Sequence, residues 1–259
     1  MKDQYVGDAG DYGKYGLLRY LAQNGIRIGV NWYLTENDKI AIDENVRGYD
    51  GSIRGYLEHD EEGVYDRDVF ELLKSLPKKS VSFIETSNII PDAVFYGEKL
   101  ETANVPKAMR KAERDAWHEK AVAALEDAEL IFCDPDNGSV DEKGAIGKYG
   151  EKYVSLQELK AYYDSKKDVV YYCHKARRTP EAWQKKMVEL RSVCPDVRII
   201  VLTYRRGTQR SYIFGIHPER YETFNRLIDG FLQTSWGSHA VGRTHIPFFR
   251  ESLSGDCDR

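Results

Sequence analysis

Three polar side chains that can act on a substrate stand directly after one apolar run. Residues 130–133 are Leu-Ile-Phe-Cys, which predicts a short buried strand, and Asp134, Asp136 and Asn137 follow it at once. In an open parallel sheet, ligands bind just beyond the carboxyl ends of the strands. The position therefore predicts an active site with Asp134, Asp136 and Asn137 as catalytic residues. The alternative is a simple turn, because Asp and Asn side chains also fold back onto their own backbone.

Two further strand ends carry histidine, tyrosine and basic side chains. These are His174, Lys175, Arg177 and Arg178 after one strand, and Tyr204, Arg205, Arg206 and Arg210 around the last turn. Guanidinium groups grip phosphate oxygens, so arginines beside carboxylates favour a substrate that carries phosphates. Taken singly, a histidine at a strand end is more often structural, and a loop arginine is more often solvated. Their joint placement at one sheet edge predicts a substrate-binding role.

Strands and helices alternate along the chain. Apolar runs predict strands at 28–34, 81–84, 130–133, 168–172, 197–203 and 209–216, with the last two paired across residues 206–208. Helices are predicted at 68–76, 107–125, 156–163 and 218–232, and two more begin at caps Asp11 and Thr179. This order predicts an α/β fold, an open, mostly parallel sheet with helices on both faces and an antiparallel strand pair at the end. We expect a single domain over 1–259, with loop excursions at 35–66 and 86–106 and a tail at 235–259.

Composition narrows the class of protein. Of the 259 residues, 41% are hydrophobic and 31% are charged, which is typical of a soluble globular protein. A net charge of −4 argues against a uniformly basic nucleic-acid binder, although it allows a local basic face. The chain begins without the apolar core of a signal peptide and contains no apolar run of ~18 residues, so we expect a cytoplasmic protein with no membrane partner. Clustered carboxylates suit hard cations, but no ligand spacing matches a known metal site.

A frame near the N-terminus resembles a known family. Gly7, Asp11 and Lys14 form G-x-x-x-D-x-x-K ahead of an apolar helix. This frame is similar to the motif His-Ala-Gly-Asn-His-Ala-Asp-Val-Leu-Lys-His of the large-subunit ribosomal RNA adenine-N6 methyltransferase J family. That family also has a strand ending in Asp-Pro-Pro-Tyr, where this chain has Asp-Pro-Asp-Asn at 134–137, and then two strands and a late hairpin. The resemblance implies a Rossmann-like methyltransferase fold, substrate or cofactor binding near Gly7, Asp11 and Lys14, and Asp134 as the acid that meets a flipped base.

The chain departs from this family in both halves of the methyl-transfer site. The family's glycine-rich cofactor loop follows the first strand, but residues 32–37 here are Trp-Tyr-Leu-Thr-Glu-Asn. Asn137 replaces the tyrosine that stacks on the target adenine, and Asp136 replaces the second proline. A retained Asp134 in changed surroundings favours an enzyme that still captures a flipped base but hydrolyses its glycosidic bond.

We therefore expect a DNA N-glycosylase that leaves an abasic site and needs no cofactor, with DNA as its partner. Asp-Pro after a strand is similar to the water-activating motif of uracil-DNA glycosylases. A stand-alone enzyme of this kind would resemble the phage-defence glycosylases that remove glucosylated hydroxymethylcytosine from viral DNA. Two alternatives stay open. One is an adenine-N6 methyltransferase on RNA or DNA that uses S-adenosylmethionine, and the other is a non-catalytic protein that binds nucleotides or nucleic acid.

Overall fold

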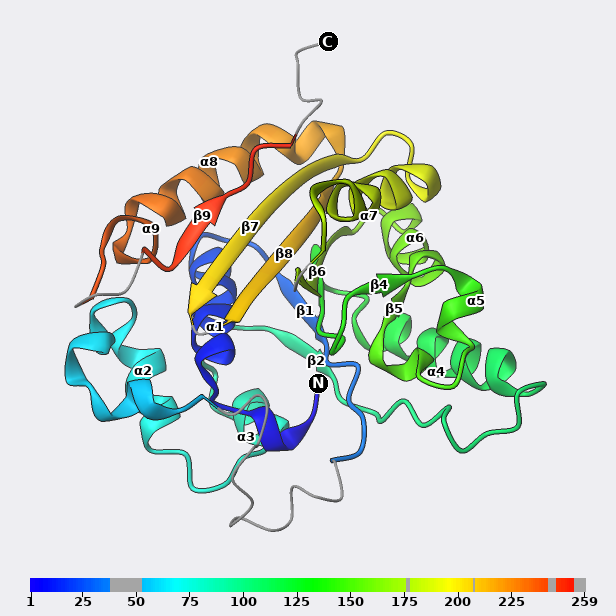
Figure 1. The fold of residues 1–259 in the computed structure, drawn as a ribbon, viewed down its shortest axis with the longest axis horizontal. Helices are drawn as coiled ribbons and strands as arrows, with labels where there is room; N and C mark the ends of the chain where they lie inside the picture. The colour runs from blue at the N-terminus through cyan, green and yellow to red at the C-terminus, as the bar shows by residue number, and fades with distance from the viewer. Residues whose placement is uncertain (38–52, 176–177, 207, 242–245, 254–259) are drawn as a thin grey trace.

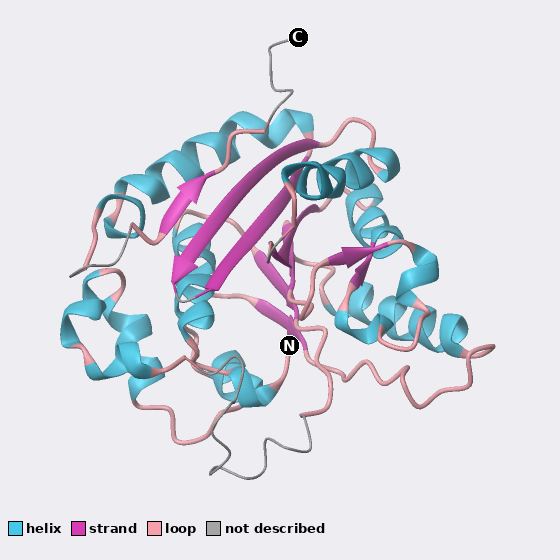
Figure 2. Ribbon diagram, viewed as in Figure 1, coloured by secondary structure: helices cyan, strands magenta, loops and turns pink. Residues whose placement is uncertain are grey.

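The central sheet has seven strands in the order β2-β1-β3-β6-β8-β7-β9 (Figure 2). The computed structural model describes residues 1–37, 53–175, 178–206, 208–241 and 246–253. The strands of this sheet are β1 (Ile28–Asn31), β2 (Val94–Tyr96), β3 (Leu130–Cys133), β6 (Asp168–His174), β7 (Arg198–Arg206), β8 (Thr208–Ile216) and β9 (Phe248–Arg250). Strands β2, β1, β3 and β6 pair in parallel, and β8 lies antiparallel between β6 and β7. The predicted Rossmann-like sheet with an antiparallel strand pair is confirmed.

Helices cover both faces of the sheet (Figure 1). One core contains residues of α1 (Ala9–Gln23), α2 (Arg67–Lys74), α3 (Val81–Thr86), α8 (Tyr221–Gln233) and α9 (Ser235–Ser238). The other core contains residues of α4 (Arg110–Ala124), α6 (Leu156–Asp164) and α7 (Pro180–Val193). In β3, Leu130 and Phe132 belong to the first core, whereas Ile131 and Cys133 belong to the second. This strand is therefore buried on both sides, which explains its unbroken apolar sequence.

Three short elements differ from the sequence-based prediction. The strand predicted at 81–84 is wrong, because this segment forms α3. Val81 and Ile84 are buried in the same core, and residues three apart share a face in a helix but not in a strand. Strand β2 lies inside the segment 86–106 that was predicted as a loop, and β9 lies inside the predicted tail. Each has only three residues, which is too short to produce a recognisable apolar alternation.

The predicted loop at 35–66 falls partly on residues 38–52, which lie outside the described residues. Its described part contains two 3-10 turns, Gly55–Glu58 and Asp60–Val64. After β3, β4 (Ser139–Val140) and β5 (Val154–Ser155) form a small parallel pair. The short helix α5 (Glu142–Ala145) lies between these two strands in the sequence. The elements beyond the carboxyl end of β3 are therefore ordered structure that borders the predicted site.

Helix α1 approaches the sheet closely because one of its sides carries no side chains. That side consists of three glycines spaced three residues apart, Gly10, Gly13 and Gly16. A Cβ atom on the second glycine would lie 2.6 Å from the ring of Tyr204, and on the first and third it would overlap Arg210 and Trp236. Side chains from β7, β8 and α9 therefore rest directly on the helix backbone. We call this side of α1 the glycine stripe.

Candidate active site

Lys14 of α1 lies between two buried carboxylates. Its Nζ is 2.6 Å from Oδ2 of Asp134, which follows β3, and 2.7 Å from Oδ1 of Asp11. The three side chains are between 5% and 7% exposed. Burial alone would lower the pKa of Lys14, but the two carboxylates raise it well above its ordinary value. Lys14 is therefore a fixed ammonium that holds Asp11 and Asp134 at the carboxyl edge of the sheet.

Asp134 itself experiences opposing influences. Burial raises the pKa of its carboxyl group, and Lys14 opposes that rise. Its backbone also belongs to the sheet, since its N–H donates to the carbonyl oxygen of Asn31 in β1 over 2.9 Å. Asp134 is held by both main chain and side chain, so it provides a rigid reference point for the residues that follow.

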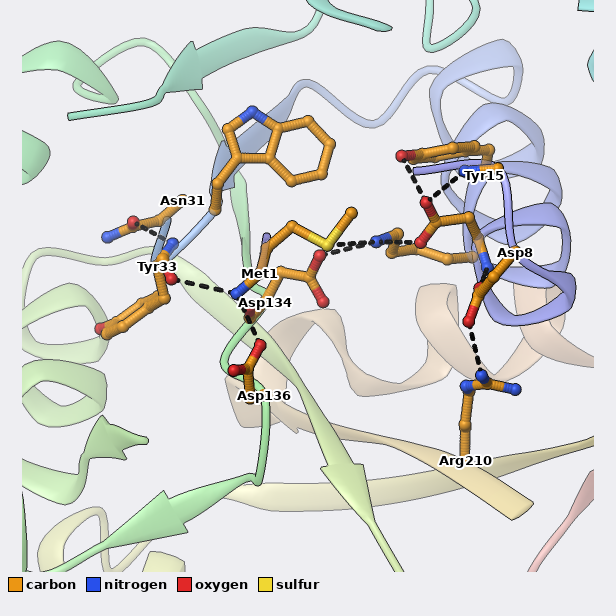
Figure 3. Close-up of polar contacts among 12 residues, drawn as sticks. Met1, Asp8, Tyr15, Asn31, Tyr33, Asp134, Asp136 and Arg210 are labelled. Carbon is orange, nitrogen blue, oxygen red and sulfur yellow. Dashed lines mark hydrogen bonds and ion pairs between the residues drawn. The ribbon is translucent and has the colours of Figure 1, made fainter. Parts of the chain in front are cut away.

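Asp8 caps helix α1 and also pairs with β8 (Figure 3). Its Oδ1 accepts the backbone N–H of Asp11 over 2.8 Å, so Asp8 is the N-cap that the sequence-based prediction placed at Asp11. Its Oδ2 accepts a hydrogen bond from Nη2 of Arg210 over 2.8 Å. Burial raises the pKa of Asp8 to about 6, although the guanidinium of Arg210 lowers it and Asp11 adds a smaller rise. Asp8 is thus a carboxyl group that exchanges a proton near neutral pH.

The α-amino group of Met1 contacts the segment after β3. It donates to the carbonyl oxygens of Tyr33 and Asp134, each over 3.0 Å, and lies 3.1 Å from Oδ1 of Asp136 (Figure 3). The side chain of Asp136 is 17% exposed, compared with 7% for Asp134. Asp136 is therefore the more accessible of the two carboxylates in the Asp-Pro-Asp-Asn segment.

These groups line one cavity of about 380 Å³ at the carboxyl edge of the sheet. Seven of the predicted site residues border it, namely Asp11, Lys14, Asp134, Asp136, Asn137, His174 and Arg210. The volume lies near the lower end of the range of roughly 300–1,000 Å³ for ligand pockets. The cavity thus combines a small-molecule size with an unusually dense set of charged groups.

The other predicted substrate-binding residues of the last hairpin do not line this cavity. Arg206 pairs with Glu62 and lies over the ring of Tyr65. Arg205 is exposed and lies over the ring of Phe249, with its guanidinium carbon 4.9 Å from the ring centre. Tyr204 is fully buried against the glycine stripe. Of the three predicted arginines of the hairpin, Arg210 therefore borders the carboxylates, whereas Arg205 and Arg206 do not.

The basic residues after β6 are also engaged elsewhere. Lys175 pairs with Glu251 over 2.8 Å, and Arg178 donates to the carbonyl oxygen of His174. Arg177 lies outside the described residues. Gly7 helps to hold the side chain of Asp11 in place, because its N–H donates to Oδ2 of Asp11 over 2.9 Å. Of this group, Gly7 and Arg178 each hydrogen-bond a residue of the cavity wall, namely Asp11 and His174.

Several cavity residues were missed by the sequence-based prediction. Besides Asp8, they include Tyr5, Lys152, Tyr172 and Tyr212. Tyr172 pairs with Tyr212 across β6 and β8, two positions before the pair formed by His174 and Arg210. Residues two apart in a strand share a face, so this alternation was a signal that could have found both tyrosines. Lys152 comes from the connection before β5, and its sequence carries no comparable signal.

The place of the family's cofactor loop, directly after β1, is filled by large side chains. Trp32 and Tyr33 are both completely buried. Trp32 stacks on Phe95 with ring centres 5.9 Å apart, and its Nε1 donates to Glu85 over 2.9 Å. The Tyr33 hydroxyl donates to Glu158 over 2.9 Å. Solid packing therefore occupies the part of the sheet edge where the methyltransferase family binds its methyl donor.

The described residues contain no group of three or more His, Cys, Asp or Glu side chains placed to hold a metal ion. None of the described helices has the length and hydrophobicity needed to cross a bilayer.

Comparison with known proteins gives little further information. No family model matches the chain, and no curated protein sequence matches it. Among solved structures, the crystal structure of protein LPL1258 from Legionella pneumophila, a DUF519 protein, aligns over 98% of this chain and 97% of its own. The identity is 11% and the TM-score is 0.41. At this level of similarity, the comparison assigns no family to the chain.

Proposed function

We propose that this protein is a DNA N-glycosylase that takes a flipped nucleotide into the cavity and hydrolyses the bond between its base and sugar. The observation that carries the proposal is that Asp8 and Asp136 line the same cavity in different environments. Glycosidic hydrolysis needs one carboxyl group that gives a proton and one carboxylate that acts on water or on the sugar. Asp8 is buried and paired with Arg210, whereas Asp136 is partly exposed and faces the α-amino group of Met1. Two carboxyl groups in such unlike environments suit these acid and base roles.

The proposed step assigns a task to each group. A water oxygen bonds to the anomeric carbon of the sugar, and the bond from that carbon to the base nitrogen breaks. Asp136 accepts the proton of the water and stabilises the positive charge on the sugar, while the base leaves with the electron pair and takes a proton from Asp8. Asn137 has an amide that both donates and accepts, which suits the edge of a base.

Methyl transfer is less well supported by the packing after β1. Trp32 and Tyr33 follow β1 directly and are completely buried, so the glycine-rich loop expected there for a methyltransferase has no counterpart in this chain. The cavity lies instead over β3, β6 and β8, where Asp134, His174 and Arg210 border it. DNA as the substrate is supported by Lys2 and Lys152 in the cavity wall, because cations beside a base pocket suit the phosphates that flank a flipped nucleotide.

The decisive experiment is base release without an added cofactor. Purified protein is incubated with single- and double-stranded DNA that contains uracil, alkylated bases or glucosylated hydroxymethylcytosine, and released bases and abasic sites are measured by mass spectrometry. We expect release from at least one modified DNA. Thermal denaturation with S-adenosylmethionine is run in parallel. A rise in melting temperature with that cofactor, combined with no base release from any DNA, would support the methyltransferase alternative instead.

The pH dependence of base release provides a separate prediction for Asp8. Because Asp8 must hold a proton to act as an acid, the rate is expected to fall as the pH rises through about 6, the pKa of this group. The variant Asp8→Asn is expected to lose that descending limb and to be slower by a factor of about 10²–10⁴, whereas Asp8→Glu restores the limb. Single-turnover rates between pH 5 and 8 test this. An unchanged limb in Asp8→Asn would remove Asp8 from the role of acid.

A further inference from the structure

Arg210 reaches the cavity in an extended, buried conformation. It stands in β8 opposite His174 of β6, and its side chain lies flat on the glycine stripe at Gly10. Only 9% of the residue is exposed. Its Nη2 donates to Asp8, so one end of the guanidinium is fixed (Figure 3). The orientation of this side chain is therefore set by the fold and not by a ligand.

The other terminal nitrogen of the guanidinium, Nη1, can still donate a hydrogen bond. Nη1 of Arg210 is buried and has no acceptor within hydrogen-bond reach among the described residues. Leaving a buried donor unsatisfied costs about 1–3 kcal/mol, so native proteins retain such a group where a ligand or a special role explains it. Arg210 also borders the cavity, so we take a molecule bound there as the source of the missing acceptor.

The chemistry of the guanidinium limits what that acceptor can be. Arginine only donates, so its partner must be an acceptor atom. Asp8 already accepts a hydrogen bond from Nη2, and Asp11 and Asp134 border the same cavity, which favours a neutral oxygen over a phosphate at this point. Among nucleobases, cytosine, thymine and guanine carry an exocyclic carbonyl oxygen, whereas adenine carries an exocyclic amine that donates.

We propose that Nη1 of Arg210 binds an exocyclic carbonyl oxygen of the base, so that the cavity accepts keto bases and rejects adenine-type bases. This inference deepens the proposed function, on which it rests, by naming the class of base. Arg210 is then a specificity-determining residue. It acts on the same flipped base whose departure Asp8 assists, and its place beside Asp8 couples recognition to proton donation.

Free bases that differ at a single carbonyl test the proposal without any catalysis. The two pairs are hypoxanthine against adenine, and cytosine against 4-aminopyrimidine. Dissociation constants are measured by NMR titration. We expect the keto member to bind about 10- to 100-fold more tightly in at least one pair, the range for a hydrogen bond to a charged donor. Equal affinities within both pairs, or no binding of any base, would overturn the inference, and competition by inorganic phosphate would assign Nη1 to a phosphate instead.

Variants locate the effect at Arg210. Arg210→Met is expected to remove the preference for the keto member. Because this change leaves Asp8 without its partner, the double variant Asp8→Asn/Arg210→Met is measured as well and is expected to give the same result. The control is Arg19→Met, which removes another partly buried arginine paired with an aspartate, Asp66, outside the cavity. A preference that survives in both Arg210 variants contradicts the inference. Because base binding is read directly, its failure is distinguishable from a failure of DNA hydrolysis.

Discussion

Replacing Lys14 with methionine is expected to lower the free energy of unfolding by about 3–5 kcal/mol. Methionine fills similar space but leaves Asp11 and Asp134 buried without the cation that both contact within 2.7 Å. Removal of one member of a buried ionic cluster is costly because the remaining charges cannot regain their water. Urea denaturation at pH 7, followed by circular dichroism, measures the change.

Two comparisons make the Lys14 result specific. Lys120→Met removes an exposed ion pair with Glu98 and is expected to cost less than about 1 kcal/mol. The triple variant Asp11→Asn/Lys14→Met/Asp134→Asn removes the whole cluster of charges and is expected to recover most of the lost stability, because no buried charge is left unpaired. If Lys14→Met cost no more than Lys120→Met, the cluster would not be the rigid support described above.

The variant Asp136→Asn is expected to reduce base release from DNA by a factor of about 10²–10⁴ while the protein stays folded. Asparagine keeps the size of the side chain but neither accepts a proton from water nor stabilises a cationic sugar. The variant loses the ion pair with the α-amino group of Met1, but that group keeps its hydrogen bonds to the carbonyl oxygens of Tyr33 and Asp134. We therefore expect a smaller loss of stability than for Lys14→Met. Single-turnover kinetics on the best DNA substrate measure the loss.

The matched control for Asp136 is Asp127→Asn. Asp127 is exposed and precedes β3, at the end of the strand opposite to the cavity. Its replacement removes the same charge and is expected to leave the rate unchanged. A rate for Asp136→Asn within threefold of the natural protein, with normal folding, would assign the carboxylate role to another residue.

The elements that bury a long apolar run could be predicted from the sequence, and the short ones could not. Several consecutive apolar residues predict strand β3, and two apolar runs joined by a turn predict the hairpin of β7 and β8. The mistaken strand at 81–84 arose because Val81 and Ile84 are β-branched, a preference that their packing on one face of α3 overrides. Tertiary packing decides whether such a short segment forms a helix or a strand, and the local sequence pattern carries no information about that packing.

Within the site, residues next to strand ends were predictable and their partners were not. Asp134, Asp136 and His174 follow from where β3 and β6 stop. The pairing of Asp8 with Arg210 joins positions 202 residues apart, so no local pattern reveals it. The same limit explains Arg206, which meets Glu62 from a segment whose position over the sheet a sequence does not indicate.

The glycine stripe has a mechanical consequence for the site. Asp8, Asp11 and Lys14 all belong to the first turns of α1 or its cap, while Asp134 and Arg210 belong to the sheet. At Gly10, Gly13 and Gly16 the side chains of Arg210, Tyr204 and Trp236 lie directly on the helix backbone, so little space is left there to absorb movement. Helix α1 and the sheet therefore act as two rigid bodies that pack tightly against each other. A shift of α1 therefore changes every distance between the helix residues and the sheet residues of the cavity at once. It leaves the distances among the residues of α1, and among those of the sheet, unchanged.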